Sequence, residues 1–384
     1  MNQREVGESY DTIIIGAGPA GSTLGYLLSK SNLKVLLVDQ ASFPRPKLCG
    51  GLITWKTRSL IEEIFGSKFD ELFLVENISD HFYVYEKRRQ IIFLPSPEPF
   101  YFIDRQNYDA TLLRHAIDGG CERLLNERVV RISETENEII TQSGRIFKGR
   151  VIVGADGVNS LARRMIYSQE KFRHDLALAM QVNVPYDLLR QEYRDRYPKI
   201  FFGTIQHGYS WIFPNKERAL LGMGGLMRKN KEPLSSFNEF LTMVLEENRE
   251  PLKTVKAHTI PFGNFVDAPG RDRLLLVGDS AGLVDPFLGE GIYYAHKSAA
   301  CASKAILRYF AESSGRELAA VYKADLSPLY KELAVAKRFR NLAFSKLRLL
   351  GYKVFKGPAI YNKFVDLVHG KKSYLRLPII SRFT

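Results

Sequence analysis

The first forty residues alternate between apolar runs and glycine-rich or polar breaks. Tyr10–Ile15 is a short run rich in β-branched residues, which is typical of a buried strand. Ser22–Lys30 follows with a helical pattern, and Lys34–Val38 is a second apolar run. This order predicts a strand–helix–strand unit. The uncharged stretch Thr12–Ser29 is not predicted to span a membrane, because four glycines and Pro19 interrupt it.

The turn between the first strand and the helix contains Gly16, Gly18 and Gly21 in the spacing GxGxxG. In a dinucleotide-binding fold the first glycine makes the tight turn, the second lets the backbone approach the pyrophosphate, and the third lets the helix pack on the strand. The helix N-terminus then presents free amides to the phosphates. Asp39 ends the second strand, where such a fold places a carboxylate on the ribose. We therefore predict a dinucleotide site; an ordinary glycine-rich turn is the alternative.

Further elements follow along the chain. Gln106–Asp118 is amphipathic and comes after a short apolar run that ends at Arg105. Arg128–Phe147 alternates and contains Ser143-Gly144, so we predict a hairpin with its turn at that pair. We also predict buried strands at Val151–Val153 and Arg273–Val277 and a helix at Gly289–Tyr309.

The middle of the chain has a different pattern. From Lys171 to Pro261 the predicted strands are longer and rich in Tyr, Phe and Trp. Such segments are typical of an antiparallel sheet with one buried face. Since a buried strand of the first type returns at Arg273, the first domain is predicted to be discontinuous in sequence.

Composition limits the classes of protein that fit. The chain has 384 residues, 45% of them hydrophobic and 25% charged, close to the average for soluble globular proteins. Cys49, Cys121 and Cys301 lie far apart with no CxxC pair, which argues against a disulfide framework or zinc cluster and favours the reducing cytoplasm. The histidines show no metal-ligand spacing, so no metal site is predicted. We interpret four of them as ordinary polar or core residues: His115, His207, His258 and His296.

The net charge of +13 is concentrated near the C-terminus. Residues 331–384 hold 13 Lys and Arg against Glu332 and Asp366, and no nucleic-acid-binding motif accompanies them, so no nucleic-acid partner is expected. Apolar residues at helical spacing with basic residues between them predict a basic amphipathic helix that docks on an anionic membrane surface. Packing of that stripe on its own domain is the alternative. The apolar positions are Phe339, Leu342, Ala343, Leu347, Leu350 and Val354.

Two further motifs follow the glycine turn: Gly154-Ala155-Asp156-Gly157 and Leu276-Val277-Gly278-Asp279-Ser280-Ala281-Gly282. Together the three resemble, in order and approximate spacing, those of flavoprotein monooxygenases and their relatives with the p-hydroxybenzoate hydroxylase fold. The resemblance implies FAD as the cofactor, Asp156 near its pyrophosphate and Asp279 on its flavin-side ribose. It also implies that Arg105 is aimed at the cofactor, although an exposed charge near a helix terminus would give the same pattern.

The fold class implied by this resemblance is α/β: an FAD-binding Rossmann-like domain with an inserted antiparallel-sheet substrate domain and a helical C-terminal region. We expect residues 1–75, 101–170 and 262–312 in the FAD-binding domain, 76–100 and 171–261 in the substrate domain, and 313–384 in the basic helical region. The predicted cofactor-binding residues are Gly16, Gly18, Ala20, Gly21, Asp39, Gln40, Cys49, Gly50, Arg105, Asp156, Gly157, Gly278, Asp279, Pro286, Gly289, Gly291 and Ile292.

Three local features narrow the resemblance: Lys47-Leu48-Cys49-Gly50-Gly51, Tyr209-Ser210-Trp211-Ile212-Phe213-Pro214 and Gly222-Met223-Gly224-Gly225. They are similar to those of the geranylgeranyl reductase family, whose pattern is PxxYxWxFP followed by GxGG; Gln206 stands where the first proline is expected. The match runs from about Asp11 to Ala300. It implies an FAD-dependent reductase that saturates C=C bonds of a polyprenyl group on a lipid or pigment. The external electron donor, NADPH or a ferredoxin-type carrier, is not distinguished.

The three aromatic residues of the second feature alternate along a predicted strand, so their side chains share one face. Such a wall suits a long apolar substrate, although any half-buried sheet shows the same alternation. The glycines of the third feature are predicted to leave room for a chain or a flavin ring, with a β-bulge as the alternative. The predicted substrate-binding set is Tyr209, Trp211, Phe213, Pro214, Gly222, Gly224 and Gly225.

Three residues are predicted to be catalytic. The segment Asp285–Ile292 opens a helix, and its backbone amides would favour negative charge on a reduced flavin, which indicates Gly289 and Gly291. Cys49 lies in the loop that the family places beside the flavin. A thiol there can donate a proton or tune the ring, whereas most free cysteines are inert packing residues.

Two other functions fit the same motifs. An FAD monooxygenase that hydroxylates an apolar or aromatic substrate would share the cofactor motifs. A membrane-peripheral protein could bind FAD or lipid without turnover. A flavin-dependent halogenase fits less well, because the Trp-x-Trp-x-Ile-Pro of that family is replaced here by Tyr209–Pro214.

Overall fold

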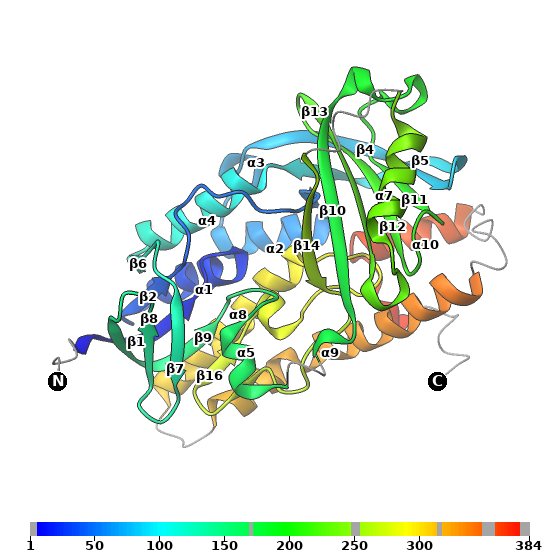
Figure 1. Ribbon diagram of the computed structural model, residues 1–384. Helices are drawn as coiled ribbons and strands as arrows, with labels where there is room; N and C mark the ends of the chain where they lie inside the picture. Colours follow the sequence, from blue (N-terminus) through cyan, green and yellow to red (C-terminus); the bar gives the residue numbers. More distant parts are fainter. Residues whose placement is uncertain (1–5, 169–171, 247–253, 313–316, 348–357, 377–384) are drawn as a thin grey trace.

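The computed structural model describes residues 6–168, 172–246, 254–312, 317–347 and 358–376 (Figure 1). Its strands form two eight-stranded sheets. This arrangement confirms the predicted α/β fold class with two sheets and a helical C-terminal region. The two sheets supply the opposite walls of the site described below.

The first sheet is built around β1 (Val6–Ile15), which pairs in parallel with β2 (Val35–Val38) and β9 (Ile146–Gly154). β2 continues in parallel to β6 (Glu122–Leu124), and β9 to β16 (Leu274–Leu276). The short β15 (Gly270–Arg271) closes one edge. The central strands are buried on both faces, as their unbroken apolar runs predict.

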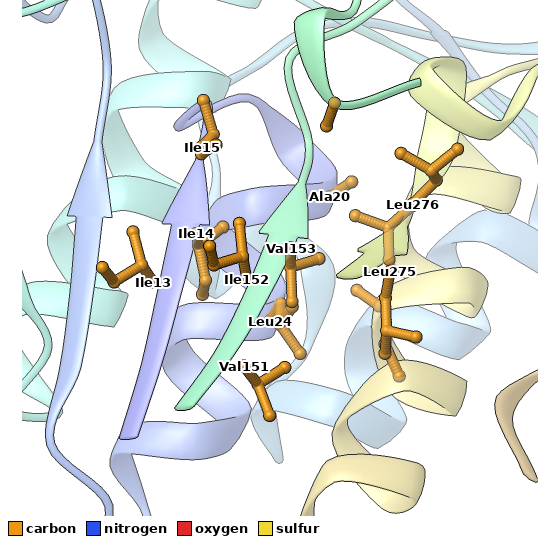
Figure 2. Close-up of a cluster of buried hydrophobic side chains, with 14 of the residues drawn as sticks. Ile13, Ile14, Ile15, Ala20, Leu24, Val151, Ile152, Val153, Leu275 and Leu276 are labelled. Atoms are coloured by element: carbon orange, nitrogen blue, oxygen red, sulfur yellow. The ribbon is translucent and has the colours of Figure 1, made fainter. Parts of the chain in front are cut away.

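Helices α1 (Pro19–Ser29), α4 (Arg105–Asp118) and α8 (Ile292–Ala311) pack together at the first sheet. Figure 2 shows side chains of β1, β9 and β16 beside Leu24 of α1 in one apolar cluster. Ile13, Val151 and Leu275 are completely buried there. This cluster fixes α1, and with it the turn that precedes it, against the strand ends.

Two predicted elements of this region differ from the structure. Arg128–Phe147 contains two hairpins instead of one. The first is formed by β7 (Val129–Ser133) and β8 (Glu138–Thr141), and the second by β8 and β9, with its turn at Ser143-Gly144. The predicted turn at Ser143-Gly144 is therefore present, whereas the turn between β7 and β8 was not predicted. The predicted helix at Gly289–Tyr309 begins only at Ile292, because residues 285–291 form a hydrogen-bonded loop.

The second sheet has the strand order β14-β10-β13-β12-β11-β4-β5-β3. It is antiparallel as predicted except between β11 and β4, which pair in parallel. Leu52–Ile53 was expected in the FAD-binding domain, but this short strand pairs with β5 and so belongs to the second sheet. The strands are β3 (Leu52–Ile53), β4 (Val75–Glu86), β5 (Arg89–Ile103), β10 (Leu176–Pro185), β11 (Lys199–Phe202), β12 (Gly208–Pro214), β13 (Arg218–Leu226) and β14 (Lys256–Pro261).

The remaining helices cover the sheets and connect them. They are α2 (Trp55–Phe65), α3 (Phe69–Leu72), α5 (Leu161–Ile166), α7 (Pro233–Val244), α9 (Leu318–Leu342), a π-helical turn at Ala343–Leu347 and α10 (Pro358–Val368). Short 3-10 turns occur at Gly278–Ala281 and Tyr374–Arg376. In the described parts of the chain, no helix is both long and apolar enough to cross a membrane.

The C-terminal region corrects the prediction of a free amphipathic helix. Phe339 and Ala343 belong to a core cluster beneath the second sheet, and Arg340 is completely buried. Figure 1 shows α9 in orange and α10 in orange-red beside that sheet. The described part of the apolar stripe therefore packs on its own protein. Leu350 and Val354 lie outside the described residues.

One buried carboxylate holds α9 in place. Asp175 lies directly before β10 and is 2% exposed. Its Oδ2 lies 2.6 Å from Lys337 Nζ and 3.7 Å from Arg340 on α9, and its Oδ1 lies 3.1 Å from Arg228. Burial disfavours the charged form, but these cations outweigh it and hold the pKa of Asp175 below its ordinary value. Basic residues that suggested a membrane surface are thus used inside the fold.

We expect Asp175→Asn to lower the free energy of unfolding at pH 7 by about 3 kcal/mol, since it leaves the buried Arg340 without a carboxylate partner. The folded-state pKa is depressed, so this stabilisation is present above the unfolded pKa of about 4 and is lost as pH falls through the folded value. Urea denaturation at several pH values measures both the loss of stability at pH 7 and its dependence on pH.

The difference between wild type and Asp175→Asn should narrow below pH 4. The matched control is Asp325→Asn, which removes the exposed ion pair to Arg308 on the neighbouring helix. Asp325→Asn should lower the free energy of unfolding by less than about 1 kcal/mol. Equal losses for both variants, or a pH-independent loss for Asp175→Asn, would contradict the assignment.

Candidate active site

A cavity of about 830 Å³ extends between the two sheets. Loops after β1, β2 and β9 form one end, and β10, β12 and β14 form a long wall. The cavity brings most of the predicted residues together from distant segments. Those that line it are Gly16, Gly18, Ala20, Asp39, Gln40, Cys49, Gly50, Arg105, Asp156, Gly157, Tyr209, Trp211, Phe213, Gly224, Asp279, Gly289, Gly291 and Ile292.

The glycine turn at one end is built by close backbone contacts. Gly16 has φ +105°, and a Cβ there would clash with the Ala155 carbonyl. A Cβ on Gly21 would clash with the Gly16 carbonyl, so this glycine packs the helix on the turn and does not line the cavity. Gly18 differs, because a Cβ there would meet only Arg45, at 3.7 Å. The backbone at the start of α1 is therefore open to a ligand.

Asp39 shapes this turn as well as facing the cavity. Its Oδ2 accepts a hydrogen bond from the Ala17 amide at 2.7 Å, and its Oδ1 accepts one from the Ala41 amide at 2.8 Å. The carboxylate is 9% exposed. It thus ties the loop after β2 to the loop after β1, while its remaining lone pairs face the space where a ribose is expected.

Asp156 caps the next helix. Its Oδ2 accepts hydrogen bonds from the amides of Leu161 and Ala162, at 2.6 and 3.2 Å, at the start of α5. Its Oδ1 is buried and has no partner among the described residues. Burial raises the pKa of Asp156, although these hydrogen bonds oppose the shift. An unpartnered oxygen at this position is suited to a ligand that donates a hydrogen bond.

Arg105 lines the cavity, but its guanidinium does not extend freely into it. Nε and Nη2 bind the two carboxylate oxygens of Asp109 at 2.8 and 3.1 Å. Arg45 lies 3.5 Å from the same carboxylate. Burial opposes the charge on Arg105, yet Asp109 and Cys49 outweigh it and raise its pKa. The alternative of an exposed charge is wrong, because Arg105 is 8% exposed.

Cys49 lies close to Lys47 as well as to Arg105. Its Sγ accepts a hydrogen bond from the Gly51 amide at 3.4 Å. Two residues earlier, Lys47 Nζ lies 2.7 Å from Nε2 of His258 on β14. Lys47 and His258 both line the cavity. This contact joins the loop after β2 to the wall formed by the second sheet.

Asp279 faces the same part of the cavity from the turn after β16. Burial raises its pKa, while Lys47, Arg105 and Arg163 act in the opposite direction. The adjoining Gly278 does not line the cavity; it packs with φ +60° against Ala20 and α8. Asp279 is the residue of this motif that a ligand can reach.

The loop before α8 is held by buried hydrogen bonds. Asp285 Oδ1 accepts the amides of Phe287 and Leu288 at 2.8 Å each, and both its oxygens accept from the Tyr374 hydroxyl at 3.0–3.1 Å. Gly289 has φ +69°, which favours glycine at this turn. Pro286 faces away from the cavity, towards Gly263 and α9.

Glu290 is a buried anion in this loop. Its Oε1 accepts hydrogen bonds from Thr54 and Thr57 at 2.7 and 2.9 Å, and its Oε2 lies 2.6 Å from Lys56 Nζ. Burial acts against the charge on Lys56, but Glu290 and Asp285 outweigh it and raise the pKa of Lys56. The loop that carries Gly289 and Gly291 is therefore fixed on both sides.

The predicted aromatic wall is present. The rings of Tyr209, Trp211 and Phe213 follow one another at centroid distances of 5.9 Å on the cavity face of β12. The Tyr209 hydroxyl donates to the Leu288 carbonyl, which connects this wall to the loop before α8. Nε1 of Trp211 is buried without a partner among the described residues. Pro214 ends the strand outside the cavity.

The three glycines of β13 have different roles, which corrects the expectation that all leave free space. A Cβ on Gly222 would clash with the Trp211 indole, so that ring already occupies the space. Gly224 lines the cavity, and a Cβ there would lie 3.6 Å from the same indole, an ordinary contact distance. Gly225 faces the opposite side of the sheet, where Ile205 and Asn230 lie close. Of the three, only Gly224 opens onto the cavity, because Trp211 fills the space at Gly222 and Gly225 lies on the other face of the strand.

The apolar end of the cavity contains residues that sequence reasoning missed. Phe82 and Phe100 lie edge to face at 5.6 Å, and Phe364 of α10 lies 6.5 Å from Phe82. Val368 of the same helix also lines the cavity. The signal was the apolar spacing of 361, 364, 365 and 368 in a segment interpreted as a membrane-binding tail.

Comparisons with known proteins identify related sequences over most of the chain. A family model described as "FAD binding domain" matches residues 9–336. A digeranylgeranylglycerophospholipid reductase of Methanococcus aeolicus is 29% identical, covering 77% of this chain and 76% of its own. A geranylgeranyl diphosphate reductase of Rhodobacter capsulatus is 28% identical, covering 94% of this chain and 88% of its own.

Among solved structures, a geranylgeranyl bacteriochlorophyll reductase-like protein of Thermoplasma acidophilum superposes with a TM-score of 0.71. The match covers 94% of this chain and 92% of that protein, at 19% sequence identity. At this identity the superposition shows a shared fold.

The residues at the first end of the cavity fit the FAD expected from the sequence. The open backbone at Gly18 precedes the free amides of α1, which suits a pyrophosphate. Carboxylates at Asp39 and Asp279 lie on either side of that turn and suit ribose hydroxyls. The unpartnered Oδ1 of Asp156 is an acceptor, so it suits a hydroxyl group of the cofactor rather than its pyrophosphate, which has no proton to donate. The chemistry of this donor and acceptor set agrees with the cofactor.

We expect Asp279→Asn to weaken FAD binding by about 1–3 kcal/mol, roughly 5- to 150-fold in Kd, because one acceptor oxygen of the partly buried carboxyl group becomes an NH2 donor. Titration of the apoprotein with FAD, followed by quenching of flavin fluorescence, measures the change. Asp272→Asn is the matched control: this residue is exposed in a turn with φ 49°, which Asn accepts. Identical Kd values for Asp279→Asn and wild type would contradict the assignment.

Proposed function

The chain belongs to the FAD binding domain family and is an FAD-dependent oxidoreductase, and from this premise we propose that it saturates C=C bonds of a polyprenyl group on a lipid or pigment. Its resemblance to geranylgeranyl reductases is confirmed by the similar proteins of that name. The observation that carries the proposal is the division of the cavity into a charged end and an apolar end.

The charged end accounts for the cofactor. Arg45, Asp39 and Asp156 lie around the glycine turn, where they suit the polar half of a dinucleotide. The opposite end continues past Cys49 and the aromatic wall into a space lined by Phe82, Phe100 and Phe364. Isoprenoid chains are apolar and unsaturated, so burial of their surface against these rings supplies the binding energy.

The residues between the two ends would orient the reacting groups. Bound FAD supplies the electron pair of the reduction. Tyr209 and Trp211 form a fixed wall for the prenyl chain, since the Tyr209 hydroxyl is bound to the Leu288 carbonyl. The loop before α8 brings Gly289 and Gly291 to the cavity without side chains of their own, and the Gly289 amide is used within the loop, where it donates to the Asp285 carbonyl at 2.9 Å. Apolar walls exclude water, which protects the reduced cofactor from side reactions.

Cys49 is retained in this proposal as a proton donor or a residue that tunes the cofactor. It lies between the loop after β2 and the aromatic wall, with Gly50 packed against the Phe213 ring. Lys47 and Arg105 are close enough to interact with it electrostatically. The thiol lines the cavity beside the aromatic wall, a position from which it could donate a proton or contact the cofactor.

The reductase and a monooxygenase are distinguished by what reoxidises the reduced protein. Anaerobically reduced holoprotein should be reoxidised by geranylgeranyl diphosphate, with a saturated product detected by mass spectrometry. A hydroperoxyflavin absorbance transient with oxygen, coupled to a hydroxylated product, would favour the monooxygenase. If the reduced protein forms neither a saturated nor a hydroxylated product, the result would favour a binding protein without turnover.

We expect Val368→Asp to slow reoxidation by the prenyl substrate at least about 10-fold, because an unpaired carboxylate would enter the apolar end. Its FAD content and absorption spectrum should be unchanged. Asn362→Asp places the same charge on the exposed face of the same helix and should react like wild type. Equal rates in the two variants would exclude this end as the prenyl site.

We also propose that the protein works in the cytoplasm and approaches an anionic membrane surface through its C-terminal region. The proposal is supported by exposed side chains on and after α10, namely Lys363, Leu375 and Arg376. The helix that carries Lys363 also lines the apolar end of the cavity. Docking there would let an insoluble chain enter without crossing water. The electron donor, NADPH or a ferredoxin-type carrier, binds transiently in this proposal.

We expect Lys363→Glu/Arg376→Glu to reduce cosedimentation with vesicles of anionic phospholipid, since each basic residue at such a surface contributes about 1 kcal/mol. The effect should disappear at high salt. Lys304→Glu/Lys323→Glu changes the net charge equally at exposed positions on α8 and α9 and should bind like wild type. Binding of wild type that ignores both lipid charge and salt would contradict the proposal.

A further inference from the structure

Lys47 and His258 form a contact between two bases inside the cavity. Lys47 Nζ and His258 Nε2 are 2.7 Å apart, a hydrogen-bonding distance. One nitrogen must donate and the other accept, so the contact cannot persist with both groups fully protonated. It can hold one positive charge, as an ammonium bound to neutral imidazole, or none. The pair therefore has two hydrogen-bonded states that differ by a single proton.

The surroundings make the charge of this pair sensitive to its neighbours. Burial is the largest influence on Lys47 and lowers its pKa; Asp279 and Cys49 oppose this, and Arg105 and Arg45 add to it. Burial, Lys47 and Arg105 together lower the pKa of His258 to about 4. The imidazole thus stays neutral near pH 7, and Lys47 is the member that exchanges the proton. A new negative charge nearby would favour the ammonium.

The proposed reaction needs such a proton. Saturation of one C=C bond breaks the π bond and forms two C–H bonds, one from a hydride and one from a proton. Reduction of bound FAD by a two-electron donor takes up one proton and leaves a negative charge on the cofactor. A second proton must be held close by until the substrate reacts. The pair lines the cavity next to Cys49 and Asp279, at the junction of its charged and apolar ends.

We propose that the Lys47–His258 pair is the proton store of this reaction. Lys47 takes up a proton from solvent when bound FAD gains two electrons, and that proton passes to the alkene carbon that does not receive the hydride. His258 is a positioning residue that accepts the hydrogen bond of the ammonium. The inference rests on the proposed function, but the coupling of proton uptake to FAD reduction can be measured without any prenyl substrate.

The test is the midpoint potential of FAD in the purified holoprotein from pH 6 to 10, determined against reference dyes. Each proton coupled to a two-electron reduction changes the equilibrium tenfold per pH unit, which is about 30 mV. Wild type should show a region with a slope of about 60 mV per pH unit, between the pKa values of Lys47 in the oxidised and reduced protein. Outside that region, above the titration of the flavin itself, the slope should be about 30 mV.

Two substitutions separate charge from proton exchange. Lys47→Met removes the group, whereas Lys47→Arg keeps a cation that does not titrate in this range. Both should lose the steeper region, and Lys47→Arg should have the higher midpoint potential. Lys304→Met, at an exposed position on α8, is the control and should keep the wild-type profile. A structural tie between the loop and β14 would not link the potential to pH.

The outcomes are distinguishable from those for the proposed function. A wild-type slope near 30 mV throughout, or a steep region that persists in both Lys47 variants, overturns the proton store. If the steep region depends on Lys47 but no prenyl substrate reoxidises the protein, the store stands and the substrate assignment fails. If the substrate is reduced while the slope is unchanged by Lys47→Arg, the substrate assignment stands and the store fails.

Discussion

The cavity depends on three backbone segments that meet without side chains between them. Gly16 lies against the Ala155 carbonyl, and Gly21 lies against the carbonyl of Gly16, so any larger residue at either position would separate β1, α1 and the loop after β9. This close packing aims the N-terminus of α1 at the cavity and leaves Gly18 open. The apolar strands behind it keep the arrangement rigid (Figure 2). Asp39 then needs only to tie the neighbouring loop to Ala17 to complete the cofactor end.

Local patterns were sufficient to predict the parts of the site that are built from contiguous residues. The strand–turn–helix unit and the aromatic face of β12 follow from spacing and strand periodicity, and the loop that carries Asp279 follows from a contiguous motif that resembles the family. Their agreement with the structure has a physical reason: each depends on backbone geometry or on the alternation of one strand. The predicted turn at Ser143-Gly144 is present between β8 and β9, but the turn between β7 and β8 was missed, since one turn signal does not show how many strands the segment contains.

The remaining site residues could not be predicted, because their roles arise from contacts between distant segments. Lys47 and His258 are 211 positions apart and meet only because β14 forms the edge of the second sheet beside the loop after β2. The space over Gly222 is filled by Trp211, and only the register between β12 and β13 reveals this. A glycine in a sequence shows where a side chain is missing. It does not show which neighbour occupies the space.

The C-terminal region shows how a strong compositional signal can have a different cause. Its excess of positive charge suggested a surface, yet Lys337 and Arg340 bind Asp175 within the fold, and Phe364 lines the cavity. The Tyr374 hydroxyl reaches Asp285, the residue that shapes the loop before α8. The apolar wall and the loop facing the cofactor are therefore positioned by the same end of the chain. Glu332 of α9 accepts hydrogen bonds from the Tyr374 amide and the Ser373 hydroxyl, so α9 also helps to place this end of the chain.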